Sequence, residues 1–175
     1  VLGISQREFE QIFPADGWVE HRAADIWKSV LEVGREMVAK AISLGLTIKV
    51  AGITNQRETA LVWDRKTGEV VYNAIVWQDR RTSTQCKKLS DEGCLVNVRQ
   101  ATGLVLDPYL SATKIAWILD NVDGLRSRAV RGELCFGTVD SFLIWKMTGG
   151  SRHVTDATNA SRTSLYNIRK GIWDP

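Results

Sequence analysis

The feature of this sequence that most constrains its fold is a stretch at residues 46–59 that changes abruptly from apolar to polar. Its first part predicts a strand over residues 46–54, buried on at least one face, because it carries the apolar residues Leu46, Ile48, Val50 and Ile53. The polar pair Arg57 and Glu58 follows directly. Ligands bind at the carboxyl ends of strands in open α/β sheets, so this pair would lie where a ligand is expected.

Arg57 and Glu58 offer complementary hydrogen-bonding groups. A guanidinium supplies only donors, whereas an ionised carboxylate supplies only acceptors. A compact polyol, whose hydroxyls both donate and accept, could bond to both side chains at once. The alternative is that the two residues form an ordinary surface ion pair, which contributes little to stability. The two residues by themselves leave both interpretations open.

The rest of the pattern predicts an α/β domain. Apolar residues recur at intervals of three and four over residues 23–44, which indicates an amphipathic helix, and Gly45 suits its end. Runs at 60–63 and 70–77, separated by a turn that contains Gly68, predict a β-hairpin. The other expected elements are a short strand at 1–9, helices at about 78–92 and 95–101, a helix capped by Ser111, a strand at 133–137, a helix at 139–147 and a strand-like run at 164–168.

Composition limits the class of protein. With 175 residues, of which 44% are apolar and 25% charged, the chain suits one globular domain. The net charge of +3 is too small to indicate nucleic-acid binding, and we interpret the basic pairs Arg80–Arg81 and Lys87–Lys88 as a solvated helix face. No apolar run reaches the ~20 residues of a membrane span. Reduced thiols in a cytoplasmic protein are indicated by three widely spaced cysteines, Cys86, Cys94 and Cys135.

The sequence contains no complete nucleotide-binding or hydrolase motif. A phosphate-binding loop, a dinucleotide fingerprint, a zinc-protease motif and a nucleophile elbow are all missing. A site would have to combine Arg57–Glu58 with Trp77, the polar run at 78–82 and the loop Asp107-Pro108-Tyr109. Each has an alternative explanation: Trp77 as a core residue that closes an apolar strand, Asp107-Pro108 as a simple turn, and Tyr109 as a half-buried loop aromatic.

Five motifs, in order along the chain, resemble those of the FGGY carbohydrate kinase family. They cover essentially the whole chain and lie at residues 55–59 (NQRET), 73–82 (NAIVWQDRRT), 107–114 (DPYLSATK), 137–146 (GTVDSFLIWK) and 155–163 (TDATNASRT). The first of them is similar to the glycerol-phosphorylating branch of the family rather than the xylulose branch. Leu110 stands where the family commonly has Phe, a departure that affects packing more than chemistry.

The resemblance implies a fold and a set of site residues. The fold is a ribonuclease-H-like (actin-like ATPase) α/β domain, present in part, with a mixed sheet flanked by helices. Arg57, Glu58 and Tyr109 would hydrogen-bond the hydroxyls of glycerol, and Trp77 would pack against its carbon backbone. The implied reaction uses ATP and Mg²⁺ to phosphorylate glycerol, in a cytoplasmic enzyme that could be a homo-oligomer and binds neither nucleic acid nor a membrane.

The resemblance also implies what residues 1–175 lack. We expect the family's phosphate-binding segment, its general-base Asp and its nucleotide-binding second domain outside this chain, which would be a single domain within the amino-terminal part of a kinase. The start at Val1, without Met, favours a piece of a longer protein. We therefore expect a kinase as the parent and an inactive chain on its own. The alternatives are a kinase for another polyol or a pentulose, and a non-catalytic binding or interaction module.

Overall fold

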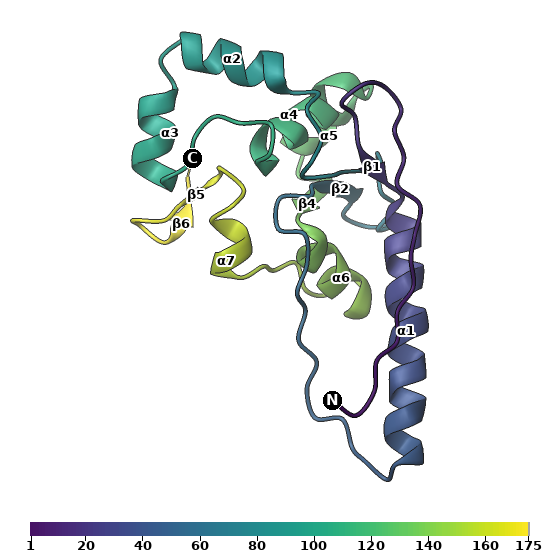
Figure 1. Cartoon of the computed structure of the whole chain (residues 1–175). Coiled ribbons are helices and arrows are strands. Elements are labelled where there is room, and N and C mark those ends of the chain that lie inside the picture. Colours follow the sequence, from purple (N-terminus) through teal and green to yellow (C-terminus); the bar gives the residue numbers. More distant parts are fainter. Residues whose placement is uncertain (175) are drawn as a thin grey trace.

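The computed structural model describes residues 1–174, which form seven helices and six short strands (Figure 1). The helices are α1 (Ala23–Ser43), α2 (Ser83–Asp91), α3 (Leu95–Thr102), α4 (Ser111–Asn121), α5 (Leu125–Val130), α6 (Val139–Met147) and α7 (Ala157–Ala160). The strands are β1 (Glu20–His21), β2 (Leu61–Asp64), β3 (Ala74–Ile75), β4 (Leu134–Gly137), β5 (Tyr166–Asn167) and β6 (Ile172–Trp173). The predicted helices are confirmed, although α2 begins at Ser83 rather than near residue 78. The short helices α5 and α7 have no periodic pattern that predicts them.

Strand pairing among the described residues consists of three antiparallel pairs. β2 pairs with β4, β1 with β3, and β5 with β6. An isolated bridge between Ala60 and Ile75 makes β3 a neighbour of β2 as well. The α/β class is confirmed, but residues 1–174 form none of the parallel pairs that a mixed sheet contains.

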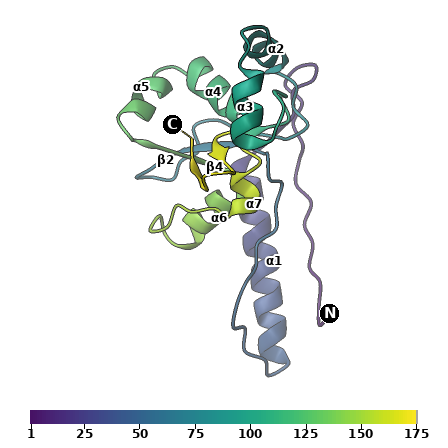
Figure 2. The same ribbon diagram turned by 90° about the vertical axis from the view of Figure 1, so that its left-hand side faces the viewer.

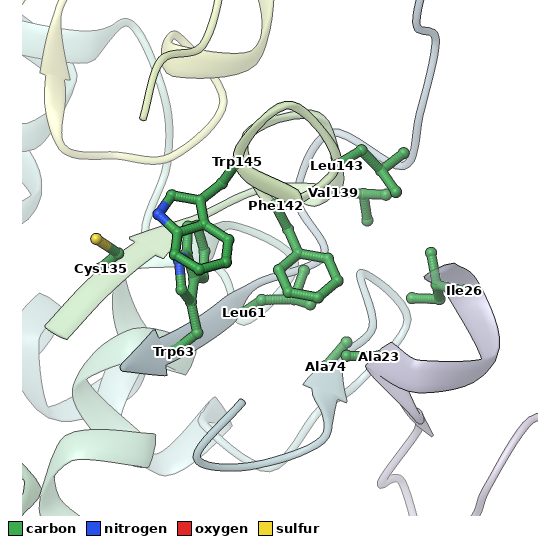
Figure 3. Close-up of a cluster of buried hydrophobic side chains, with 10 residues drawn as sticks. All are labelled: Ala23, Ile26, Leu61, Trp63, Ala74, Cys135, Val139, Phe142, Leu143 and Trp145. Carbon is green, nitrogen blue, oxygen red and sulfur yellow. The ribbon is translucent and has the colours of Figure 1, made fainter. Parts of the chain in front are cut away.

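The β2–β4 ladder separates two hydrophobic clusters. Successive side chains of a strand point to opposite faces, so Leu61 and Trp63 pack with α1 and α6, whereas Ala60 and Val62 pack with α4 and α5. Figures 1 and 2 show α6 on one side of this ladder and α4 with α5 on the other. Figure 3 shows Trp63, Phe142 and Trp145 in the cluster that contains α1 and α6. The helix expected at 139–147 is confirmed as α6, and six of its nine residues are buried.

The predicted hairpin is confirmed in its turn and its pairing. Trp63 and Val70 form an antiparallel bridge, and the Gly68 amide donates to the Asp64 carbonyl at 2.9 Å. Gly68 has a φ of +73°, and a Cβ there would lie 2.2 Å from the Trp145 ring. Both the backbone conformation and the close approach of Trp145 therefore require glycine at this turn.

The longest helix, α1, is amphipathic over only part of its length. Ala23 and Ile26 are buried near its start, whereas Val38 and Ile42 near its end are exposed. The helix ends as predicted, with Gly45 in the left-handed conformation. Among residues 1–174 no helix combines the length and the apolar character needed to cross a membrane.

The strand predicted at residues 46–54 does not form, and neither does the one at 1–9. Leu46, Ile48 and Val50 are exposed, Val50 by 84%. A β-strand satisfies its backbone amides and carbonyls only through a neighbouring strand. Within the described residues, no backbone group of 47–54 bonds to another backbone segment. The apolar pattern identified a segment with β propensity but could not supply its pairing partner.

The basic pairs were only partly interpreted correctly. Lys87 and Lys88 are exposed as predicted, and Arg80 is 53% exposed beside Asp107. Arg81, however, has a side chain that is 0% exposed. The interpretation of Arg81 as part of a solvated helix face is therefore wrong, because its charge partners come from elsewhere in the fold.

Arg81 is the centre of a buried charge network. Its guanidinium donates to Glu20 Oε1 at 2.7 Å and to Asp79 Oδ2 at 2.8 Å, and both carboxylates are buried. The indole rings of Trp18 and Trp117 lie over the same guanidinium, with centroids at 3.9 and 4.6 Å. The network thereby joins β1, the segment before α2, and α4.

We predict that Arg81→Met lowers the free energy of unfolding by about 3–5 kcal/mol, because it leaves the carboxylates of Glu20 and Asp79 buried without their cation. The matched control is Arg80→Met, which removes a neighbouring exposed guanidinium and should cost no more than about 1 kcal/mol. Denaturant unfolding of the two variants measures the difference. Equal losses in both variants would contradict the role assigned to Arg81.

Candidate functional site

Residues 55–59 form a turn that is anchored at both ends. At its start, Asn55 Nδ2 donates to Asp140 Oδ1 at 3.3 Å, and the same buried Asp140 accepts a hydrogen bond from Thr155 Oγ1 at 2.7 Å. At its end, the amide and hydroxyl of Thr59 donate to the backbone and side-chain oxygens of Gln56, at 3.3 and 2.8 Å. Arg57 and Glu58 lie between these anchors, immediately before the Ala60–Ile75 bridge.

Glu58 is held through both its carboxylate and its carbonyl. Oε1 accepts a hydrogen bond from Arg162 Nε at 2.7 Å, in an ion pair whose carboxylate is almost fully buried. The carbonyl oxygen accepts from Ser111 Oγ at 3.2 Å and from Lys114 Nζ at 3.3 Å. The prediction that Ser111 caps α4 is wrong. Leu110 occupies the N-cap position, and the Ser111 hydroxyl donates to the Glu58 carbonyl instead.

The rings of Trp77 and Tyr109 form an aromatic corner, and Arg162 links this corner to Glu58. The rings of Trp77 and Tyr109 meet edge to face, with centroids 5.7 Å apart and planes at 79°. The Arg162 guanidinium lies 5.4 Å from the centroid of Tyr109. Trp77 is 39% exposed, so the alternative that it is a core residue is wrong.

The loop before α4 positions Tyr109. Asp107 Oδ1 accepts hydrogen bonds from the Tyr109 amide and from Arg80 Nη1, both at 2.8 Å. The Leu110 amide closes a turn by donating to the Asp107 carbonyl at 3.1 Å. Asp107-Pro108 is thus a turn, as the simpler interpretation had it, and this turn fixes the backbone of Tyr109. A hollow of about 480 Å³ lies here, lined by Arg80, Gly103, Leu104, Val105, Asp107, Tyr109, Leu110 and Arg162.

Arg57 stands apart from this corner. Its side chain is exposed and forms no hydrogen bond or ion pair with residues 1–174. It lines a different hollow of about 710 Å³, together with Asn55, Asp140, Thr155 and Asp156 among others. Of the four predicted site residues, the structure brings Glu58 and Tyr109 to Arg162, and Trp77 to Tyr109. Arg57 is next to Glu58 in the chain but lines a different hollow.

Two residues of this site were not found by sequence reasoning. Arg162 lies in the last quoted motif, 104 positions after its partner Glu58. Lys114 lies in the third motif and is fully buried, although lysine is rarely buried without a partner. Local patterns do not reveal either pairing. Only the motifs themselves, which contain both residues, could have drawn attention to them.

Of the site residues, Lys114 has the pKa that departs most from its ordinary value. Burial lowers the pKa of its ammonium from the ordinary 10.5 to about 7, against the opposing charges of Asp79, Glu58 and Asp107. Between these two values the unfolded chain binds a proton at Lys114 that the folded chain does not. Stability contributed by this group therefore increases with pH over that interval and is constant below about 7.

We predict that the difference in the free energy of unfolding between the unsubstituted chain and Lys114→Met rises in favour of the unsubstituted chain between pH 7 and about pH 10. Taking the difference between the two proteins removes the contributions of tyrosines and cysteines, which titrate in the same range. Denaturant unfolding of both proteins at a series of pH values measures this difference. A difference that stays constant with pH would show that the folded and unfolded chains protonate Lys114 alike.

Among residues 1–174, no three His, Cys, Asp or Glu side chains gather closely enough to hold a metal ion. The geometry instead offers carboxylate and guanidinium groups beside two aromatic rings. Such an arrangement suits a small polar ligand with hydroxyl groups and an apolar edge.

Comparison with known proteins identifies relatives of this chain. The chain is 60% identical to a glycerol kinase from Agrobacterium fabrum over 174 residues, which are 99% of this chain and 35% of that protein. It thus spans about a third of the length of the curated relatives it matches. Among solved structures, it is similar to Plasmodium falciparum glycerol kinase with ADP, with a TM-score of 0.89 and 36% identity over 95% of this chain and 33% of the other.

The fold is also similar in a more distant structure. The xylulose kinase of Rhodospirillum rubrum superimposes with a TM-score of 0.81 over 96% of this chain and 33% of that one, at 20% identity. The predicted actin-like α/β class is therefore confirmed. The sequence model of the FGGY family of carbohydrate kinases, N-terminal domain, matches residues 1–175. The chain therefore belongs to the FGGY family of carbohydrate kinases.

Proposed function

We propose that this chain forms the glycerol-binding part of an ATP-dependent glycerol kinase. The reaction transfers the terminal phosphoryl group of ATP to a hydroxyl of glycerol and yields ADP and sn-glycerol 3-phosphate. The observation that carries the proposal is that Arg162 contacts both Glu58 and Tyr109, while Trp77 packs edge to face against Tyr109. The 60% identity to a glycerol kinase supports glycerol over a pentulose as the substrate.

Glu58 is suited to accept a hydrogen bond from a hydroxyl. Arg162 bonds to Oε1, and no donor among residues 1–174 bonds to Oε2. An ionised carboxylate oxygen accepts hydrogen bonds, so Oε2 can accept one from a ligand that supplies a donor. Because Arg162 neutralises the charge and fixes one oxygen, Glu58 can present the other in a defined direction. A glycerol hydroxyl provides the missing donor.

Trp77, Tyr109 and Arg57 would complete the contacts. The exposed ring of Trp77 offers an apolar surface for the C–H edge of glycerol, and its edge-to-face contact with Tyr109 fixes its orientation. Tyr109 carries a phenol that can donate to or accept from a second hydroxyl. Arg57 has donors that no residue of 1–174 uses, and it is adjacent to Glu58. Its long side chain can turn toward a bound polyol.

ATP and Mg²⁺ complete the proposed reaction. Phosphoryl transfer depends on positioning and on neutralising the charge of the phosphates, which Mg²⁺ supplies when bound. Residues 1–174 do not fit a metal site, because they contain no cluster of ligating side chains. We therefore assign no step to a metal held by this part of the protein. The cysteines are free, which fits the proposed cytoplasmic location.

A chimeric enzyme tests the proposal directly. Residues 1–175 replace the matching segment of the Agrobacterium fabrum glycerol kinase, and ADP formation is measured with glycerol, erythritol and xylulose as substrates. We expect the highest kcat/KM with glycerol. A clear preference for xylulose would remove the assignment, and a preference for erythritol would indicate a kinase for another polyol.

We predict that Arg57→Ala in this chimeric enzyme lowers kcat/KM for glycerol, because the substrate hydroxyls lose a charged donor. The loss corresponds to about 2–4 kcal/mol of transition-state stabilisation. The control is Lys87→Ala, which removes an exposed cation on α2 and should leave kcat/KM unchanged. Steady-state kinetics with varied glycerol gives both values. Unchanged kinetics in Arg57→Ala would exclude this residue from the site.

We also predict that the 175-residue chain alone releases no ADP in the presence of ATP and glycerol. The motifs expected to bind the phosphates and to deprotonate glycerol do not occur in its sequence. A coupled ADP assay measures this, with the chimeric enzyme as the positive control. Turnover by the isolated chain at a rate similar to the chimera would show that these motifs are dispensable.

A further inference from the structure

Lys114 occupies an unusual position next to the proposed glycerol site. It lies in the first turn of α4, and its side chain is completely buried. Its Nζ donates to three carbonyl oxygens, those of Tyr109 at 2.5 Å, Leu110 at 3.1 Å and Glu58 at 3.3 Å. A lysine ammonium has three donors, so these three carbonyls use its full capacity.

The three carbonyls belong to two segments that are distant in the sequence. Glu58 is in the turn at 55–59, whereas Tyr109 and Leu110 are in the loop before α4. Each segment carries a side chain that we assign to glycerol binding. The ammonium bonds only to backbone atoms, so it fixes where the two segments stand and leaves the side chains of Glu58 and Tyr109 free to meet a ligand.

We propose that Lys114 is a positioning residue for glycerol, which holds the Glu58 turn and the Tyr109 loop at the separation that the substrate requires. The inference rests on the proposed function, because it concerns the same site. It adds a residue that touches no substrate atom and acts through two residues that do. A small error in their separation would weaken binding strongly, because the contacts to a compact ligand must form together.

The burial of this cation supports a specific role. An apolar side chain of similar length would fill the same space without the cost of burying a charge. Replacing the ammonium by a neutral amine would also turn a lone pair toward a carbonyl oxygen, since an amine has only two N–H donors. The charged or titratable groups that act on the ammonium are Asp79, Glu58, Asp107 and Cys86, and burial brings its pKa to about 7.

The test compares Lys114→Met with the unsubstituted chimeric enzyme. Methionine retains the length of the side chain and removes every donor. We expect the KM for glycerol to rise by about tenfold or more, as for the loss of charge-assisted hydrogen bonds, while the KM for ATP stays the same. Ser111→Ala, which removes the other donor to the Glu58 carbonyl but keeps Lys114, should raise the same KM by a smaller factor.

A purely structural role gives a different result. It would lower the melting temperature and the active fraction of Lys114→Met but leave the KM for glycerol of the folded enzyme unchanged, and that result would overturn the inference. If Lys114→Met does not fold, the unsubstituted enzyme still provides the test. Its KM for glycerol should rise as pH increases above about 7, where Lys114 loses its proton. A KM that does not change between pH 6 and 9 would also overturn the inference.

The proposed function and this inference can fail separately. If Arg57→Ala and Glu58→Ala leave the glycerol kinetics unchanged, the site itself is wrong, whatever Lys114 does. If those two variants lose glycerol use and Lys114→Met keeps the original KM, the site is right and only the positioning role is wrong. Lys87→Met, which removes an exposed lysine of α2, controls for a general effect of substituting lysine by methionine.

Discussion

The geometry of the site depends on Glu58, where three segments that are remote in the sequence meet. Arg162 holds its carboxylate, and Ser111 with Lys114 holds its carbonyl. The extended segment before the turn, residues 47–54, forms no ladder with other described residues, so a sheet does not fix Glu58 from that side. Charged and polar side-chain contacts supply the positioning instead. Loss of Ser111 or Lys114 leaves the Glu58 carbonyl with the other donor, whereas loss of Arg162 leaves the Glu58 carboxylate without its cation.

Much of the fold could be predicted from the sequence because its signals are local. The α1 helix follows from periodicity, the 60–77 hairpin from turn chemistry and α6 from a continuous apolar run, each within a short window. The strands expected at 1–9 and 46–54 fail for a different reason. An apolar alternating segment has β propensity, but a strand exists only where another strand offers its backbone groups. That partner is a property of the whole fold.

The site was predicted in part for the same reason. Glu58, Trp77 and Tyr109 lie in short motifs with conspicuous residue types, and the structure brings them together. Arg162 and Lys114 are also in motifs, but their importance arises from pairing across 104 and 56 positions, which no local pattern reveals. For Arg81 the sequence pattern predicted exposure, but the side chain is buried. Two buried carboxylates and two indole rings surround it.

We propose that a small triol binds at the Glu58 carboxylate and against the rings of Trp77 and Tyr109. A crystal structure of the chimeric enzyme with glycerol tests this most directly. We predict glycerol with one hydroxyl within hydrogen-bonding distance of Glu58 Oε2, another near Arg57, and its carbon chain against Trp77. Glycerol bound elsewhere, with Glu58 still paired only to Arg162 and the aromatic corner filled by water, would contradict it.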